Sequence, residues 1–233
     1  MHKVASGEFF YCTSLDFYAK RNHNSSMKIK KVECRKMLVP NELQEFLNKN
    51  GETITTAQAN VLGVSNERLR LLVQAGELER AAHGVYTSST DFPDKMYIAQ
   101  LRRPKMIYSH ETALFLHELT DRDPISYSVT VPYSYNAGAI IAEGIVVYST
   151  KKEFHSLGSM QMETMFGNPV TVYGMERTIC DCIRSRNKMD IAIVTDALKR
   201  YARRSDKNLN TLMEMAEVFR VMKTLRNYME VLP

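Results

Sequence analysis

The segment from Thr53 to Tyr86 constrains the fold more than any other part of the chain, because helix formers and turn formers alternate along it in a fixed order. Thr55 or Thr56 can cap a short helix whose apolar residues recur at helical spacing, and Gly63 ends that helix. Ser65 then stands where a good N-cap would begin a second helix. This order predicts a helix-turn-helix.

The second predicted helix has one apolar and one polar face. Leu69, Leu72 and Val73 recur at the spacing of a buried stripe. The opposite face carries amide and guanidinium side chains, which are the groups that read base edges from a recognition helix. The residues predicted to contact DNA, including the caps and the turn that follows, are Thr55, Thr56, Ser65, Asn66, Arg68, Arg70, Gln74, Arg80 and His83.

A short hairpin is predicted directly after this helix. Gly76 ends the helix, and Leu78–Arg80 and Val85–Thr87 alternate like two strands around a compact turn at residues 82–84. With a first helix beginning after Pro40, these elements predict a winged helix-turn-helix domain over residues 37–88. An ordinary core-forming helix pair is the alternative.

The charge of this segment is unusual for a DNA-binding domain. Residues 39–87 carry four Lys or Arg and six Glu, and phosphate contacts supply most non-specific affinity for DNA. Cations are therefore expected from elsewhere, or two copies share paired half-sites of an operator. The possible phosphate contacts are Arg102, Arg103, Lys105, Lys199, Arg200, Arg203 and Arg204. For the cluster at residues 199–204, a solvated helix end is the alternative.

Composition indicates a soluble globular protein, which we expect to be cytoplasmic and associated with the nucleoid. The net charge is +5, and the first 38 residues hold eight Lys or Arg against three acidic residues. Residues 1–36 are predicted to form a loosely ordered basic extension, or to precede a later start of the chain at Met27 or Met37. The four cysteines form no C-x-x-C pair, so no disulfide framework, metal site or cofactor is expected.

The rest of the chain predicts a second domain of the α+β class over residues 94–233. Turn formers and a proline at residues 87–94 predict the boundary. Strands are predicted at residues 125–131, 144–148 and 170–173, and residues 138–144 as a connection between strands. Helices are predicted at residues 94–101, 109–119, 175–186, 190–203 and 210–232.

Two strings in this second domain carry a family resemblance. They are YSHETALFLH at residues 108–117 and VYGMERTICD at residues 172–181. Following a winged helix, they resemble the AbiEi antitoxins of bacterial abortive-infection systems, over residues 38–232. The resemblance implies repression of the protein's own operon by the N-terminal domain. It also implies that the C-terminal domain counteracts a nucleotidyltransferase toxin in the type IV manner, without a stable complex.

The resemblance implies a protein without a catalytic step of its own, and two other function classes remain open. One is an enzyme that holds Mg²⁺ between Glu176 and Asp181, although Arg177 and Asp181 can equally form an ion pair one helical turn apart. The other is a regulator whose second domain binds a metabolite. His110 and His117 lack the spacing of a zinc motif, so a structural role at the helix is expected for His110.

Overall fold

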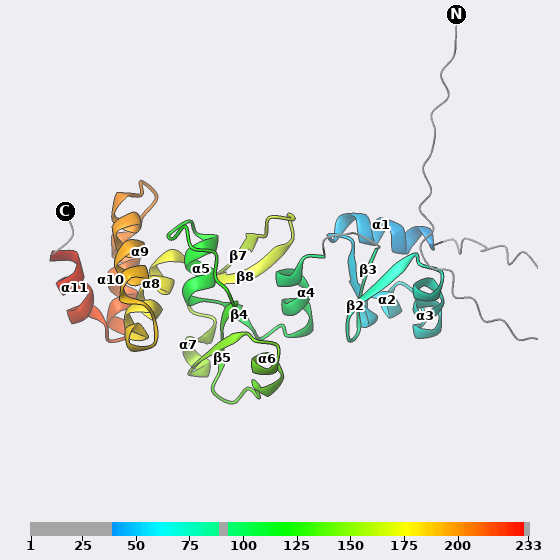
Figure 1. Ribbon diagram of the computed structural model, residues 1–233, viewed down its shortest axis with the longest axis horizontal. Coiled ribbons are helices and arrows are strands. Elements are labelled where there is room, and N and C mark those ends of the chain that lie inside the picture. The colour runs from blue at the N-terminus through cyan, green and yellow to red at the C-terminus, as the bar shows by residue number, and fades with distance from the viewer. Residues whose placement is uncertain (1–38, 89–92, 231–233) are drawn as a thin grey trace, which may run out of the picture. The chain divides into compact units, whose positions relative to one another are not determined.

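The computed structural model describes residues 39–88 and 93–230, and the predicted basic extension at residues 1–36 lies outside them. Residues 39–88 form one small α+β module (Figure 1). Its elements in chain order are α1 (Asn41–Lys49), β1 (Thr53–Thr55), α2 (Thr56–Val61), α3 (Asn66–Gln74), β2 (Leu78–Ala82) and β3 (Val85–Ser88).

The three strands of the module form an antiparallel sheet in which the last strand is central. Its order is β1-β3-β2, with Ile54 opposite Tyr86 and Leu78 opposite Ser88. The sequence patterns did not predict β1, which is only three residues long. The core beneath the sheet is formed by Leu43, Leu47, Ile54, Ala59, Val64, Leu69, Leu72 and Leu78.

Side-chain caps and a glycine determine where helices α2 and α3 begin and end. The side chain of Thr55 accepts a hydrogen bond from the backbone of Gln58, whose own side chain bonds back to Thr55, so the two form a capping box. Ser65 accepts from the backbone N–H of Arg68 at 3.2 Å. Gly63 adopts a φ of 75° between the helices, which a residue with a side chain would adopt only under strain. The predicted helix boundaries at these residues are confirmed.

Residues 93–230 contain a mixed five-stranded sheet with the order β6-β5-β4-β8-β7. The strands are β4 (Ile107–Tyr108), β5 (Ser128–Pro132), β6 (Val146–Thr150), β7 (Ser159–Glu163) and β8 (Pro169–Tyr173). Strands β4 and β8 run parallel, as do β5 and β6, whereas β4–β5 and β7–β8 are antiparallel. The predicted α+β class is therefore confirmed for this part of the chain.

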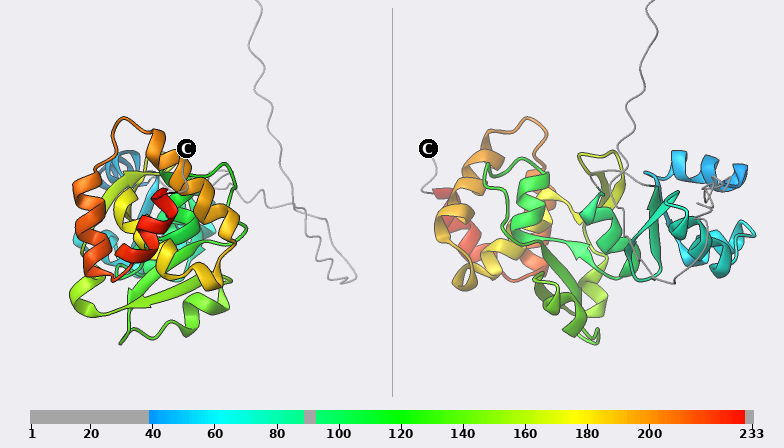
Figure 2. Two further views of the ribbon diagram at one scale, coloured as in Figure 1. Left: turned by 90° about the vertical axis from the view of Figure 1, so that its left-hand side faces the viewer. Right: turned by 45° about the vertical axis from the view of Figure 1, so that its right-hand side comes forward.

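Helices cover the sheet in two groups. The first comprises α4 (Lys95–Arg102) and α6 (Gly138–Ala142). The second comprises α5 (His110–Leu116), α7 (Lys152–His155), α8 (Met175–Arg184), the 3₁₀ turn Arg186–Lys188, α9 (Ile191–Arg203), α10 (Leu209–Val218) and α11 (Met222–Glu230). Figure 2 (left) shows α9, α10 and α11 in front of the strands. One apolar core lies between the sheet, α4 and α6, and a second lies among α5 and α8–α11.

A buried carboxylate joins the start of this domain to the tip of the β7–β8 hairpin. Asp94 is the N-cap of α4 and accepts from the backbone N–H of Tyr97 at 3.0 Å. Its other oxygen accepts from Thr164 Oγ1 at 2.5 Å and Asn168 Nδ2 at 2.9 Å. The hairpin turn is thus held by side-chain hydrogen bonds, while Met165 at its tip is 92% exposed.

Two predictions about elements were wrong. The single helix predicted at residues 210–232 is two helices, because the chain turns at Arg220, whose φ is 57°. The strand predicted from Ile125 begins only at Ser128, and Ile125 is fully exposed. The predicted connection at residues 138–144 does join β5 to β6, and it contains the short helix α6, because Ile140 packs into the core of the sheet.

Candidate nucleic-acid interface

Helix α3 presents a polar face to solvent and an apolar face to the module core. Leu69 and Leu72 are fully buried. Asn66, Arg70 and Gln74 are exposed at positions four residues apart, so their side chains lie along one side of the helix. This arrangement gives amide and guanidinium donors on a surface that a major groove can accommodate.

The hydroxyl groups predicted as DNA contacts instead bond within the module. Thr55 and Ser65 cap α2 and α3, respectively. Thr56 donates both its backbone N–H and its hydroxyl to the carbonyl oxygen of Gly84, at 2.9 and 3.2 Å. These residues therefore set the positions of α2, α3 and the hairpin turn.

Arg70 is engaged by an acidic neighbour on its own helix. Its Nε donates to Oε2 of Glu67 at 3.1 Å, and its Nη2 donates to Oε1 at 2.8 Å. The two side chains are 61% and 64% exposed. The hydrogen bonds and the attraction lower the pKa of Glu67 and raise the pKa of Arg70, so both groups remain charged at neutral pH. This i, i+3 pair was not predicted, although its spacing is visible in the sequence.

The β2–β3 hairpin carries a second set of exposed polar residues. Its strands join through a two-residue turn, His83-Gly84, in which Gly84 has a φ of 73°. The ladder shifts its register between Glu79 and Ala82, a bulge that changes the direction of the strand. Arg80 and His83 are both exposed. The hairpin was predicted at this position, and its existence is confirmed.

Most cations predicted to contact phosphate are paired with carboxylates of their own domain. Arg102 and Arg103 both contact Glu143 Oε1, at 3.0 and 2.5 Å. Arg200 donates to Asp121 and to Asp196, and these bonds raise its pKa further. Within residues 93–230, the members of the predicted set without an ion pair are Lys105, Lys199 and Arg203.

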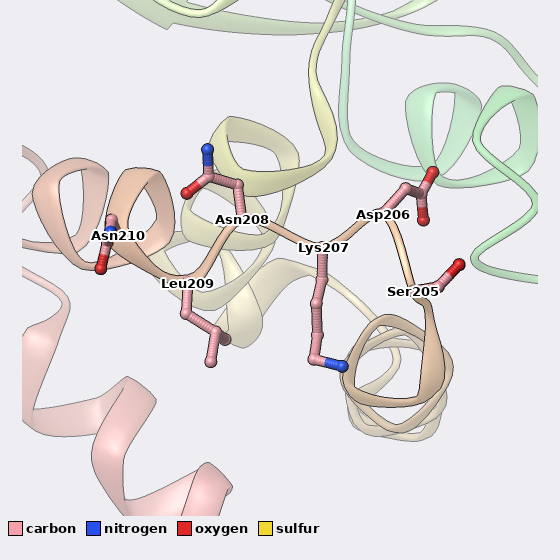
Figure 3. A pocket seen from close by; sticks show the side chains of 6 residues that line it. All are labelled: Ser205, Asp206, Lys207, Asn208, Leu209 and Asn210. Carbon is pink, nitrogen blue, oxygen red and sulfur yellow. The ribbon is translucent and has the colours of Figure 1, made fainter.

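Two cations that follow helix α9, Arg204 and Lys207, bond to groups of their own domain. Arg204 forms a two-bond pair with Asp206, at 2.7 and 2.8 Å, and also donates to the carbonyl oxygen of His117 at 3.1 Å. An open hollow of about 510 Å³ follows, lined by residues 205–210. Figure 3 shows Lys207 in this hollow with its amino group directed back at the end of α9, where it donates to the carbonyl oxygen of Arg204 at 2.9 Å.

The centre of the C-terminal helices is organised by Arg177, which is 1% exposed. Its guanidinium lies between the rings of Tyr173 and Phe219, with the carbon Cζ 4.3 and 3.9 Å from the ring centres. Nε donates to Asp181 at 2.8 Å, and Nη1 donates to two backbone carbonyl oxygens at 2.9 Å. The predicted pairing of Arg177 with Asp181 is confirmed.

The two carboxylates considered for Mg²⁺ serve separate structural contacts. Asp181 is fully buried and lies between Arg177 and Arg184. Glu176 instead accepts from the hydroxyl group of Tyr201 at 2.9 Å. Among the described residues, no group of three or more His, Cys, Asp or Glu side chains is placed to hold a metal ion.

The two histidines of the YSHETALFLH string hold the sheet to the helices. His110 is fully buried in a left-handed conformation with a φ of 49°, stacked on Tyr148 with ring centres 3.4 Å apart. Its ring nitrogens lie 3.0 Å from the hydroxyls of Ser109 and Ser185. Burial lowers its pKa to about 3, with a smaller contribution from nearby arginines. His117 contacts the carbonyl oxygen of Tyr173 at 2.7 Å.

Residues 41–89 match the family model described as "Transcriptional regulator, AbiEi antitoxin". This match confirms the predicted resemblance to the AbiEi antitoxins over these residues.

The similarity to a solved structure extends beyond the module. The RV2827C protein from Mycobacterium tuberculosis is similar in structure, with a TM-score of 0.54 and 11% sequence identity. The similarity covers 80% of this chain and 75% of that protein. At this identity the likeness concerns the fold alone. No curated protein matches the sequence.

None of the helices in residues 39–88 and 93–230 is both long enough and apolar enough to cross a membrane.

Proposed function

We propose that this protein is the antitoxin of a type IV toxin-antitoxin system and represses its own operon by binding operator DNA. The observation that supports this most directly is the match of residues 41–89 to the AbiEi antitoxin regulators. The order of elements in the module agrees with it, since a helix-turn-helix followed by a two-stranded hairpin is the arrangement of a winged helix.

In this proposal helix α3 enters the major groove and the β2–β3 hairpin follows the neighbouring backbone. Asn66, Arg70 and Gln74 would reach base edges, because they share the exposed side of α3. Arg80 and His83, exposed on the hairpin, would contact phosphate or the minor groove. Thr55, Thr56, Ser65 and Arg68 would support or flank these contacts.

The phosphate affinity that the module lacks would come from two sources. Lys105, Lys199 and Arg203 can contact phosphate without breaking an ion pair of the described domain, whereas Arg102, Arg103, Arg200 and Arg204 would first have to leave one. Two molecules on paired half-sites would add affinity without further cations. The operator therefore has two half-sites in this proposal.

The second activity belongs to the C-terminal domain, which would counteract a nucleotidyltransferase toxin without forming a stable complex with it. No catalytic step by this chain is part of the proposal. Glu176 and Asp181 support this view, because each is engaged by the side chain of a different neighbour, Tyr201 and Arg177 respectively.

Separate cores allow the two activities to be tested in truncated chains. The apolar core of residues 43–78 is distinct from the cores of residues 93–230. A chain of residues 37–89 should bind the operator weakly and fail to rescue cells from the toxin. Residues 90–233 should fold and retain part of the rescue. Rescue by residues 37–89 alone would contradict this division of roles.

A metabolite-responsive regulator is the second candidate. A groove of about 370 Å³ in the C-terminal domain is lined mainly by apolar side chains, among them Met96, Phe115, Tyr127 and Phe166. Grooves of this size and character bind small molecules. Calorimetry and operator titration with candidate metabolites distinguish the two: this alternative requires a ligand that binds the groove and changes operator affinity.

A further inference from the structure

The exposed pair of Glu67 and Arg70 leaves one edge of the arginine open. A guanidinium carries five N–H groups. Glu67 occupies the Nε–H and one hydrogen of Nη2, because its two oxygens contact those two nitrogens side by side. The edge formed by Nη1 and the second hydrogen of Nη2 remains, and two parallel donors of this kind match O6 and N7 of guanine.

We propose that Glu67 is a positioning residue that holds Arg70 so that its open edge faces one guanine of the operator. This inference rests on the proposed function, in which α3 enters the major groove. Glu67 would set selectivity for that base through Arg70, while its negative charge would lower general DNA affinity.

Two physical arguments support this role. An arginine side chain loses conformational freedom when it binds, and a carboxylate that already holds it in place reduces that cost. The charge of the module gives the second argument. Residues 39–87 already carry more acidic than basic residues, so Glu67 weakens the attraction to phosphate, and general DNA affinity does not explain its presence beside Arg70.

A matched set of variants separates charge from geometry. Glu67→Ala removes both the charge and the two hydrogen bonds. Glu67→Asp keeps the charge but shortens the side chain, so the carboxylate can no longer accept both hydrogen bonds from Arg70, three residues away. Glu45→Ala removes the same charge from an exposed position on α1 and leaves Arg70 untouched.

The experiment uses the full chain. Affinity is measured by fluorescence anisotropy for the operator, for operators with each guanine replaced in turn, and for unrelated duplex DNA. The guanine sensitive to Arg70→Lys is the one read by Arg70, because lysine keeps the charge but lacks the fork. Circular dichroism confirms that each variant folds.

The preference for this guanine should depend on the two hydrogen bonds between residue 67 and Arg70. It should fall about two- to ten-fold in Glu67→Ala and in Glu67→Asp, and stay unchanged in Glu45→Ala. Affinity for unrelated DNA should follow charge, rising in both alanine variants and staying unchanged in Glu67→Asp.

Two results would overturn this inference alone, and a third would overturn the proposed function as well. If Glu67→Ala and Glu67→Asp keep the full preference for that guanine, the carboxylate does not position Arg70. If no guanine responds to Arg70→Lys while the unaltered protein still selects its operator, Arg70 is not the reader. Failure of the unaltered protein to select any operator would overturn the proposed function itself, together with this inference.

Discussion

Helix α3 of the N-terminal module and helix α8 of the C-terminal domain each carry an arginine paired with an acidic residue of the same helix. Arg70 and Glu67 are both mostly exposed, whereas Arg177 and Asp181 are at most 1% exposed. An exposed pair contributes little to stability, because water solvates both charges well when they separate. A buried pair cannot lose one member without leaving the other uncompensated. The same chemistry thus leaves Arg70 available to a ligand and commits Arg177 to the fold.

Removal of Arg177 should produce the largest effect. Arg177→Ala leaves Asp181 buried without its main partner and removes the side chain between Tyr173 and Phe219. The free energy of unfolding should fall by about 3–5 kcal/mol. Urea denaturation followed by circular dichroism measures this. A loss below about 1 kcal/mol would show that the buried pair is not the organising contact that its geometry suggests.

Acid should destabilise the C-terminal domain through His110. Its pKa is about 3 in the folded protein and about 6.5 when unfolded, so the unfolded state binds the proton first as the pH falls. This stability is complete above pH 6.5 and is lost progressively toward pH 3. Between pH 6.5 and pH 5 the loss should be roughly 2 kcal/mol.

The variant His110→Asn should flatten this pH dependence, because asparagine does not titrate and tolerates the left-handed backbone. His83→Asn, at the exposed hairpin turn, is the matched control. Denaturation midpoints measured at several pH values give the slope for each protein. Equal slopes in His110→Asn and the unaltered protein would show that other groups cause the acid sensitivity.

Replacement of Arg70 should leave stability almost unchanged and alter DNA recognition. Because the pair is exposed, Arg70→Ala should change the free energy of unfolding by less than about 1 kcal/mol. Discrimination at one base position should fall by about 1–3 kcal/mol. Titration against a set of single-base operator variants measures the second effect. Unchanged discrimination at every position would remove α3 from the major groove.

Arg80→Ala should have the smallest effect. A phosphate contact carries no sequence information, so binding should weaken nearly equally for all sequences. The slope of log affinity against log salt should become shallower by about one. A change confined to one operator sequence would instead place Arg80 at a base.

The sequence predicted the module better than the C-terminal domain, because different interactions determine the two. Ser65, Gly63 and Thr55 act through their own backbone and that of close neighbours, so their roles were visible in a short window. Strand β4 has only two residues and exists because β5 and β8 pair with it from distant parts of the chain.

Prediction of the candidate site from the sequence was limited in the same way, because some of its contacts join distant parts of the chain. The polar face of α3 follows from helical periodicity, whereas the ion pairs of Arg102, Arg103 and Arg200 connect residues 40 or more positions apart. Charge counting alone therefore overstated the number of cations available for phosphate.

The hydrogen bonds of Asp94 determine where a C-terminal fragment can begin. This carboxylate binds Thr164 and Asn168 and also caps α4, so the first turn of α4 and the β7–β8 hairpin depend on a single side chain close to the domain boundary. Protease cleavage in the neighbouring residues 89–92 would leave all three bonds within the C-terminal fragment. Cleavage only a few residues later, after Asp94, would release the hairpin tip and uncap the helix. We therefore expect an isolated C-terminal domain to last longer in the cell when its new N-terminus lies before Asp94 than when it lies after Asp94.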